Sequence, residues 1–223
     1  MIDVIFPDLP RRALSLPAAG AVRGPGDPAP PPLGGRILLG GPVSVPLDAK
    51  AVAHDMELQA FVAAEAADAV YHLLHLSVTC EQESGLPELH TVDVALALSA
   101  DGAAAFQPTA WSMTPKQLTE TVESTTSAQL GPQLAFVGYS RSVQRSLVCL
   151  EALRELRSDP GWQIRRTRTA PIGGTYRLAM VVRAPRGATS RAALTVEAAV
   201  RKGPVLRRYR EAVPDPVTLV THL

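Results

Sequence analysis

The chain has 223 residues, of which 46% are hydrophobic and 19% are charged, and its 22 basic and 21 acidic side chains give a formal net charge of +1 at pH 7. These proportions are those of a globular protein and exclude a wholly disordered chain. The length allows one domain with a sizeable core, and we expect a tail at residues 1–35 followed by a single domain at residues 36–223.

Composition and the first residues also predict a compartment. Arginines far outnumber lysines, and alanine, proline and glycine are abundant, which indicates a GC-rich bacterial source. The start, MIDVIFPDLPRR, has Asp3 before any basic residue and prolines where a signal peptide has an unbroken apolar stretch. No run of about 18 apolar residues exists to span a membrane, and Cys80 and Cys149 are too few for a disulfide framework. We therefore expect a cytoplasmic protein without a transmembrane segment.

Residues 1–35 are rich in proline, including the run at 30–32, and end with Gly34 and Gly35. This composition predicts an extended or polyproline arm. The stretch DVIFP at residues 3–7 is a candidate for a strand docked onto the domain.

Residues 48–70 allow two interpretations. They can form a helix with Leu58, Phe61, Val62 and Ala66 on one face, or a short strand followed by the turn EAADA. The sequence does not decide between them.

Alternating apolar residues predict strands at residues 71–80 and 90–99. If the two strands pair so that opposing residue numbers sum to 170, Val78 lies opposite Val92 and both apolar faces coincide, as a half-buried hairpin requires. The same register brings Cys80 opposite His90. The residues that share these faces are Leu74, Leu76, Val78 and Cys80 in the first strand and Val92, Val94, Leu96 and Leu98 in the second.

The segment TPKQLTETVESTTSAQLG at residues 114–131 is rich in serine and threonine. Such stretches form exposed edge strands or loops, and in pore-forming proteins they can unfurl into amphipathic membrane hairpins. Its apolar alternation is poor for a lipid-facing surface, so an edge strand or loop is the preferred interpretation.

Ser140 raises the question of a catalytic serine. The stretch Gly138-Tyr139-Ser140-Arg141-Ser142 resembles the nucleophile elbow of serine hydrolases, although serine replaces the second glycine. Chain order would allow Asp159 or Asp215 as the acid and His222 as the base. No β-α repeats supply the parallel sheet of such enzymes, so a strand-end or helix-cap serine is preferred. Residues 143–157, which follow, fit either a helix or a continuing strand.

The region 161–202 predicts a β-meander of three strands. Trp162 and Ile164 face one way in the first strand, and alternating runs follow at residues 176–183 and 194–201. The link APRGATS between the last two runs holds Pro185 and Gly187 at positions that favour a type I turn.

Charge is unevenly distributed along the chain. Residues 48–129 contain 12 acidic and 2 basic side chains, whereas residues 160–210 contain 12 basic side chains and one acidic side chain, Glu197. Arginines on the meander could hold phosphate, nucleic acid, an anionic membrane or an acidic protein. Equally, the acidic and basic segments could neutralise each other, within one molecule or between copies. The candidate binding residues are Arg165, Arg177, Arg183, Arg186, Arg191 and Arg201.

Other reactive groups give weaker candidates. A histidine beside a thiol can create a nucleophile, which makes the Cys80 and His90 pair a second catalytic candidate, although inert packing is preferred. His72 and His75 lie an odd number of residues apart in a strand and so cannot share a metal ion. We expect no metal and no cofactor.

These patterns predict a mainly β protein, an antiparallel β-sandwich with one or two short helices, with an α+β arrangement as the alternative. The predicted function is a non-catalytic interaction or assembly module whose basic meander binds an acidic partner or another copy of the chain. The alternatives are a small serine hydrolase that uses Ser140 and a protein that binds nucleic acid or an anionic membrane. Nucleic-acid binding lacks a supporting motif and stacking aromatics.

Overall fold

The computed structural model describes residues 9–19, 31–47, 56–82, 85–102, 104–128, 139–202 and 204–219. Within them the chain forms antiparallel strands and a single helix. The elements are β1 (Arg11–Leu16), β2 (Leu33–Pro46), α1 (Met56–Glu65), β3 (Ala69–Cys80), β4 (Leu89–Ala100), β5 (Thr109–Thr114), β6 (Gln117–Ala128), β7 (Tyr139–Leu153), β8 (Gly161–Arg165), β9 (Gly174–Pro185), β10 (Ser190–Lys202), β11 (Val205–Ala212) and β12 (Val217–Leu219).

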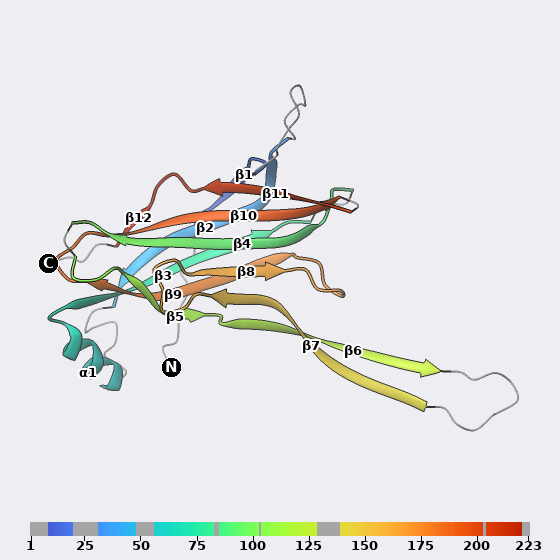
Figure 1. Ribbon diagram of the computed structural model, residues 1–223, viewed down its shortest axis with the longest axis horizontal. Coiled ribbons are helices and arrows are strands. Elements are labelled where there is room, and N and C mark those ends of the chain that lie inside the picture. The colour runs from blue at the N-terminus through green and yellow to red at the C-terminus, as the bar shows by residue number, and fades with distance from the viewer. Residues whose placement is uncertain are drawn as a thin grey trace, which may run out of the picture.

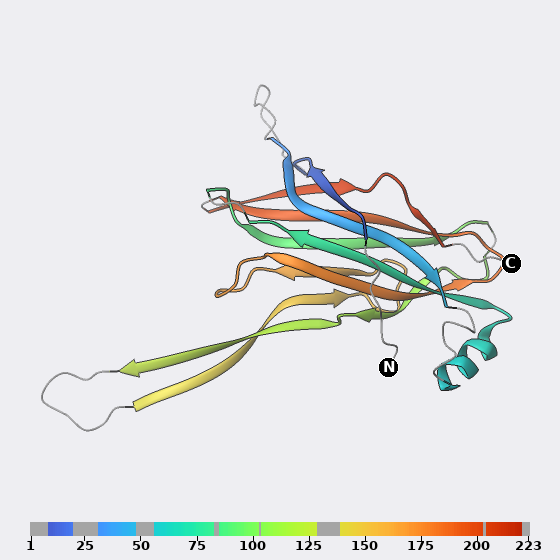
Figure 2. The same cartoon turned by 180° about the vertical axis from the view of Figure 1, so that it is seen from behind.

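The strands form two sheets that lie one behind the other (Figures 1 and 2). The five-stranded sheet has the order β1-β2-β3-β9-β5. The seven-stranded sheet has the order β11-β10-β4-β8-β7-β6, and β12 pairs with β10. This arrangement confirms the predicted antiparallel sandwich.

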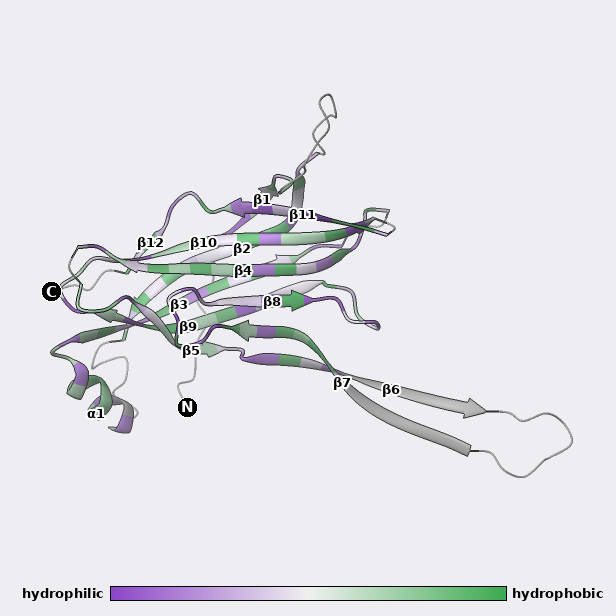
Figure 3. Cartoon of the chain, in the orientation of Figure 1, coloured by the Kyte–Doolittle hydropathy of each residue, from purple (hydrophilic) through white to green (hydrophobic). Residues whose placement is uncertain are grey.

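The core lies between the sheets because alternate residues of each strand point inward. Leu76 of β3 and Val94 of β4 belong to one cluster of buried residues that spans both layers. Figure 3 shows the same alternation along β4 and β10, where hydrophobic residues are interspersed with hydrophilic ones. Burying one such side chain contributes about 1.5–3 kcal/mol.

The predicted pairing of residues 71–80 with 90–99 is wrong. β3 pairs with β2 and β9, whereas β4 pairs with β10 and β8, so the two strands belong to different sheets. The assignment of inward faces is confirmed, since Val78 and Val92 are both buried in the shared core. Two apolar faces that coincide across a hairpin also coincide across the two layers of a sandwich, and alternation alone does not distinguish these arrangements.

The predicted meander over residues 161–202 is wrong for the same reason. Its three strands exist as β8, β9 and β10, and Trp162 and Ile164 are both buried as expected. However, β9 lies in the five-stranded sheet, while β8 and β10 lie in the other sheet and are separated by β4. The short link after Pro185 therefore crosses between layers, which are about 10 Å apart in such packing.

The two ambiguous regions are resolved in opposite ways. Residues 56–65 form the helix α1, whose Phe61 and Val62 are half-buried. Residues 143–153 continue the strand β7, and Leu150 near its end is fully buried. The helix covers part of the outer face of the five-stranded sheet, near Tyr71.

The expected N-terminal arm contains a strand. β1 pairs with β2, and its residues Leu14 and Leu16 are buried in the core. The stretch DVIFP at residues 3–7 lies outside the described residues.

Candidate functional site

The most distinctive feature of the molecule is the hairpin of β6 and β7, which runs beyond the rest of the sandwich (Figures 1 and 2). β7 pairs with β8 only over residues 150–153. Residues 119–128 pair with residues 139–148, and no other strand of the described chain lies beside these ten pairs. The outer part of the hairpin is therefore a two-stranded ribbon with two unpaired edges.

The residue types along this ribbon differ between alternate positions. Beyond the first pair of the ribbon, Thr119 and Val148, one set of positions holds only polar residue types, and the cross-strand register pairs them with each other. The other set mixes apolar residues with Glu120, Ser124, Thr126, Arg141 and Arg145. The first set contains Thr121, Glu123, Thr125 and Ser127 of β6, paired with Ser146, Gln144, Ser142 and Ser140 of β7. The segment predicted as an edge strand is thus confirmed as a strand at a sheet edge.

The root of the hairpin is anchored in the body of the protein. The Trp162 ring nitrogen donates a hydrogen bond to the carbonyl oxygen of Pro115 at 3.1 Å. The amide of Ala152 donates to the carbonyl of Lys116 at 2.8 Å, and the Lys116 ammonium lies 3.0 Å from the Glu155 carboxylate. These contacts hold the start of β6 and the end of β7 against the core.

A cavity of about 580 Å³ opens between α1 and the outer face of the five-stranded sheet. Phe61 and Val62 of α1 line one side, and Leu73 and Val181 of the sheet line the other. Trp111 of β5 also lines the cavity and is 42% exposed. The cavity residues come from five separate stretches of the chain, so no local sequence motif could have revealed them.

A polar cluster holds α1 beside this cavity. The Tyr71 hydroxyl donates a hydrogen bond to Glu65 at 2.8 Å, and Arg183 Nε donates to the same carboxylate oxygen at 2.9 Å. The Arg183 guanidinium also lies 4.3 Å from the centre of the Phe106 ring. The hydrogen bond from Tyr71, followed by that from Arg183, lowers the pKa of Glu65. Burial, reinforced by the Glu65 carboxylate, raises the pKa of Tyr71 to about 12.

The six candidate arginines do not form one surface. Arg165, Arg191 and Arg201 belong to strands of the seven-stranded sheet, whereas Arg177 and Arg183 belong to β9 in the other sheet. Arg186 directly follows β9. The single basic meander surface is therefore wrong, although a binding role for the individual arginines stays a prediction.

Several arginines are paired with acidic residues of the same molecule. Arg183 pairs with Glu65, and Arg191 pairs with Asp101 at 2.8 Å. Arg166 pairs with Glu88. All three acidic partners come from the acid-rich segment 48–129, so the basic and acidic segments neutralise each other in part within one molecule. Exposed pairs of this kind contribute at most about 1 kcal/mol each.

Ser140 does not lie on a strand-to-helix turn. It lies within β7, where its cross-strand partner is Ser127, and the sheets around it are antiparallel. The elbow interpretation is therefore wrong. Asp159 pairs with Arg154 at 3.1 Å, and Asp215 is exposed between β11 and β12. His222 lies outside the described residues.

Cys80 and His90 are not paired across a hairpin, because β3 and β4 belong to different sheets. Cys80 lies in the core, and burial raises the pKa of its thiol to about 12, which is the opposite of what a nucleophile needs. His90 lines a different cavity, at the surface of the seven-stranded sheet. The predicted Cys80–His90 juxtaposition is therefore wrong.

Within the described ranges, no three His, Cys, Asp or Glu side chains lie together as metal ligands would. His72 and His75 are both buried in β3, and burial lowers the pKa of each imidazole. Across the same ranges, no helix combines the length and apolar character needed to cross a bilayer.

Comparison with solved structures finds distant likenesses to this chain. No family model and no curated protein matches the chain. The NetB toxin of Clostridium perfringens in its membrane-inserted form is 10% identical with a TM-score of 0.27, over 68% of this chain and 82% of that one. A pore forming protein is 11% identical with a TM-score of 0.27, over 68% and 78%. Clostridium perfringens delta-toxin is 10% identical with a TM-score of 0.28, over 67% and 76%. Likenesses this distant establish neither a family nor a function for the chain.

Proposed function

We propose that this protein is a non-catalytic assembly module that acts at lipid membranes, with the β6–β7 hairpin as the part that enters the bilayer. The observation that carries this proposal is the length of the two-stranded ribbon, ten residue pairs without a third strand. Its first pairs lie beside the link between β8 and β9, where Glu120 accepts hydrogen bonds from Thr167 and Thr169. A tilted strand needs about 9–11 residues to cross the hydrocarbon core. The ribbon therefore has the length required to cross once in each direction.

The unpaired edges of the ribbon supply the reason for assembly. An isolated two-stranded hairpin is at best marginally stable in water, and its edges readily pair with other strands. Inside a bilayer every backbone N–H and C=O group must have a partner. Hairpins from several copies, paired edge to edge in a closed ring, meet this requirement. Self-association then runs through β6 and β7 rather than through an arginine surface.

The ribbon has one polar side, as a strand beside a water-filled interior requires, whereas its other side carries polar and charged residues among the apolar ones. A ring of strands in a bilayer alternates polar positions toward a water-filled interior with less polar positions toward lipid. The wholly polar set supplies the first kind of position. The mixed set contains Arg141 and Arg145, and each lipid-facing arginine costs about 2–4 kcal/mol at the midplane and about 0–1 kcal/mol near the interface. Glu120 belongs to the same set, so these charged positions oppose insertion and must be offset by the backbone pairing that a closed ring provides.

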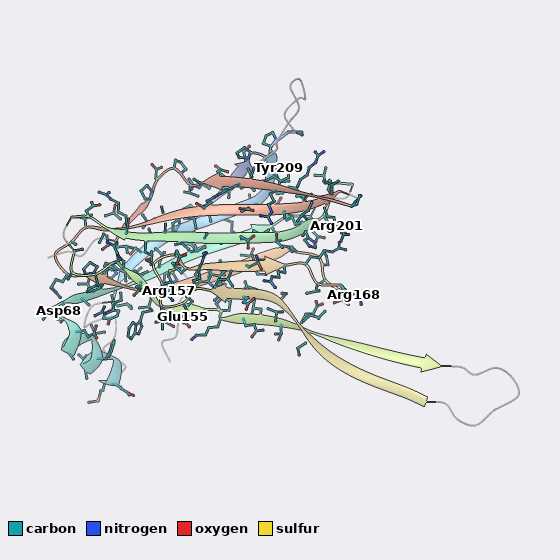
Figure 4. The ribbon with its side chains drawn as sticks, viewed as in Figure 1. Asp68, Glu155, Arg157, Arg168, Arg201 and Tyr209 are labelled. Carbon is teal, nitrogen blue, oxygen red and sulfur yellow. The ribbon has the colours of Figure 1, made fainter. Side chains whose placement is uncertain are left out.

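Arginine side chains provide a candidate contact with the membrane surface. Arg168 and Arg201 lie at the end of the sandwich toward which the hairpin runs (Figure 4). If the hairpin enters a bilayer lengthwise, these side chains meet the headgroup region. Each basic residue near an anionic surface contributes about 1 kcal/mol of attraction, and salt weakens it. Binding to anionic vesicles should therefore weaken as the salt concentration rises.

The decisive experiment shortens the hairpin without touching the core. Residues 120–147 are replaced by Asn-Gly, a two-residue turn that closes the Thr119 and Val148 pair. Full-length protein should release a trapped dye from anionic vesicles, whereas the shortened protein should bind vesicles and release no dye.

A matched control addresses the hydrolase alternative. Ser140→Ala keeps the full hairpin and removes only the candidate nucleophile, so its dye release should equal that of the unaltered protein. Loss of release with Ser140→Ala would show that this hydroxyl, rather than the length of the hairpin, carries the activity. Undiminished release by the shortened protein would refute hairpin insertion.

A further inference from the structure

The cavity beneath α1 has no role in the proposed insertion. Its volume of about 580 Å³ falls within the range of about 300–1,000 Å³ that small-molecule sites occupy. α1 lies at the end of the sandwich away from the tip of the hairpin (Figure 1). A bilayer that surrounds the ribbon would therefore not reach the cavity, and its occupant would come from solution.

The polar groups around the cavity are matched to each other. Glu65 is bonded to both Tyr71 and Arg183. Lys116, the charged residue of the lining, is paired with Glu155 at 3.0 Å. A ligand inside the cavity thus meets no unbalanced charge from these groups, and a charged group placed there would lose its hydration without gaining an ionic partner.

The apolar walls favour a flexible aliphatic ligand over a flat aromatic one. Phe61, Tyr71 and Trp111 pack against one another, with ring centres 5.7–6.3 Å apart in tilted and edge-on arrangements. Centres this close leave no gap in which a further ring could be sandwiched. The remaining walls are mostly aliphatic, and they include two methionines, whose side chains adapt to irregular shapes. These wall residues are Leu47, Val62, Leu73, Met113, Met180 and Val181.

We propose that this cavity binds a single unbranched, uncharged aliphatic chain, such as that of a fatty alcohol or fatty acid, taken up from solution. Selection comes from burial of the chain, because the charges at the rim are already balanced. The inference stands independently of hairpin insertion, since none of the ten outer residue pairs of the ribbon lines the cavity.

A chain-length series tests the class of ligand. The full chain is titrated with normal alcohols from hexanol to dodecanol, and binding is followed by calorimetry and by the fluorescence of the half-exposed Trp111. Each added methylene should tighten Kd by about fourfold, which corresponds to about 0.8 kcal/mol, until the chain outgrows the cavity and Kd levels off. An affinity that does not depend on chain length would overturn the proposal.

Variants locate the site. Val181→Phe and Val62→Phe each fill part of the cavity from opposite walls, and each should weaken dodecanol binding by at least tenfold. Val45→Phe makes the same change at an exposed position of β2 outside the lining and should leave Kd unchanged. Equal binding by all three variants would place the ligand elsewhere. Using two filling variants guards against the misfolding of either one.

Two further titrations define the ligand. Dodecanoic acid, which is ionised at pH 7, should bind no more tightly than dodecanol, because its carboxylate finds no ionic partner in the cavity, and a preference for the acid would contradict the balanced charges. Naphthalene, as a flat aromatic probe, should bind more weakly than an alcohol of equal carbon number. Vesicle binding by Val181→Phe should be unchanged if the chain comes from solution. Its loss would show that the cavity takes a bilayer lipid and would overturn the solution source.

Discussion

The root of the hairpin offers the sharpest test of how the ribbon is attached. Leu118 and Leu150 are cross-strand partners at the point where the ribbon leaves the sheet. Leu150 is fully buried against the core, whereas Leu118 is 41% exposed. Leu150→Ala should lower the free energy of unfolding by about 3 kcal/mol, as expected for a leucine truncated in a close-packed site. Leu118→Ala should cost only about 1 kcal/mol, because much of its surface already faces water.

Urea and thermal unfolding at pH 7 measure both variants. At about 2–4 °C of Tm per kcal/mol for a chain of this size, Leu150→Ala should melt about 6–12 °C lower than the unaltered protein. The two variants are matched in chemistry and in position along the hairpin, so their difference isolates burial at the root. Equal losses, or a loss below about 1 kcal/mol for Leu150→Ala, would show that the hairpin is not anchored through the core.

Two further predictions follow from buried titratable groups. Burial raises the pKa of Cys80 to about 12, so a thiol reagent at pH 8 should modify only Cys149 in the folded protein and both cysteines after unfolding. Rapid reaction of both cysteines in the folded protein would contradict the burial of Cys80. Burial lowers the pKa of His72 below its ordinary value of 6.5, so the unfolded chain binds a proton at His72 more readily than the folded protein does. The part of the folding free energy that depends on neutral His72 is therefore fully present above pH 6.5 and is lost as the pH falls through the folded pKa. His72→Phe should therefore reduce the stability lost between pH 7.5 and pH 5 in urea unfolding, and an unchanged pH dependence would contradict the assignment.

The sequence predicted strands and their inward faces well because a half-buried strand repeats every two residues. The alternation at Leu74, Leu76 and Val78 identified the core face of β3, and that at Leu194 and Val196 identified the core face of β10. It could not identify partners. The apolar faces of β3 and β4 meet whether the strands lie side by side or in opposite layers, and only long-range packing selects the second arrangement.

The site could be predicted even less. The sequence showed the ribbon only as a polar segment, because nothing local indicates that the part of β7 before residue 150 extends beyond its pairing with β8. The cluster of Glu65, Tyr71 and Arg183 joins residues separated by as many as 118 positions. Charge counting did indicate mutual neutralisation of the two segments, but it could not say which arginine meets which acid.

The order of the strands along the chain has a consequence for the time course of folding. The central pair of the five-stranded sheet joins β3 to β9, with Thr79 and Thr175 separated by 96 positions. Such contacts close long loops and form on a scale of milliseconds to seconds, whereas a local hairpin forms in about 1–10 μs. The β6–β7 ribbon can therefore form well before the body that anchors it. Newly made chains would expose their pairing edges early, so the rate at which the sandwich closes, as well as its final stability, governs how many chains associate prematurely.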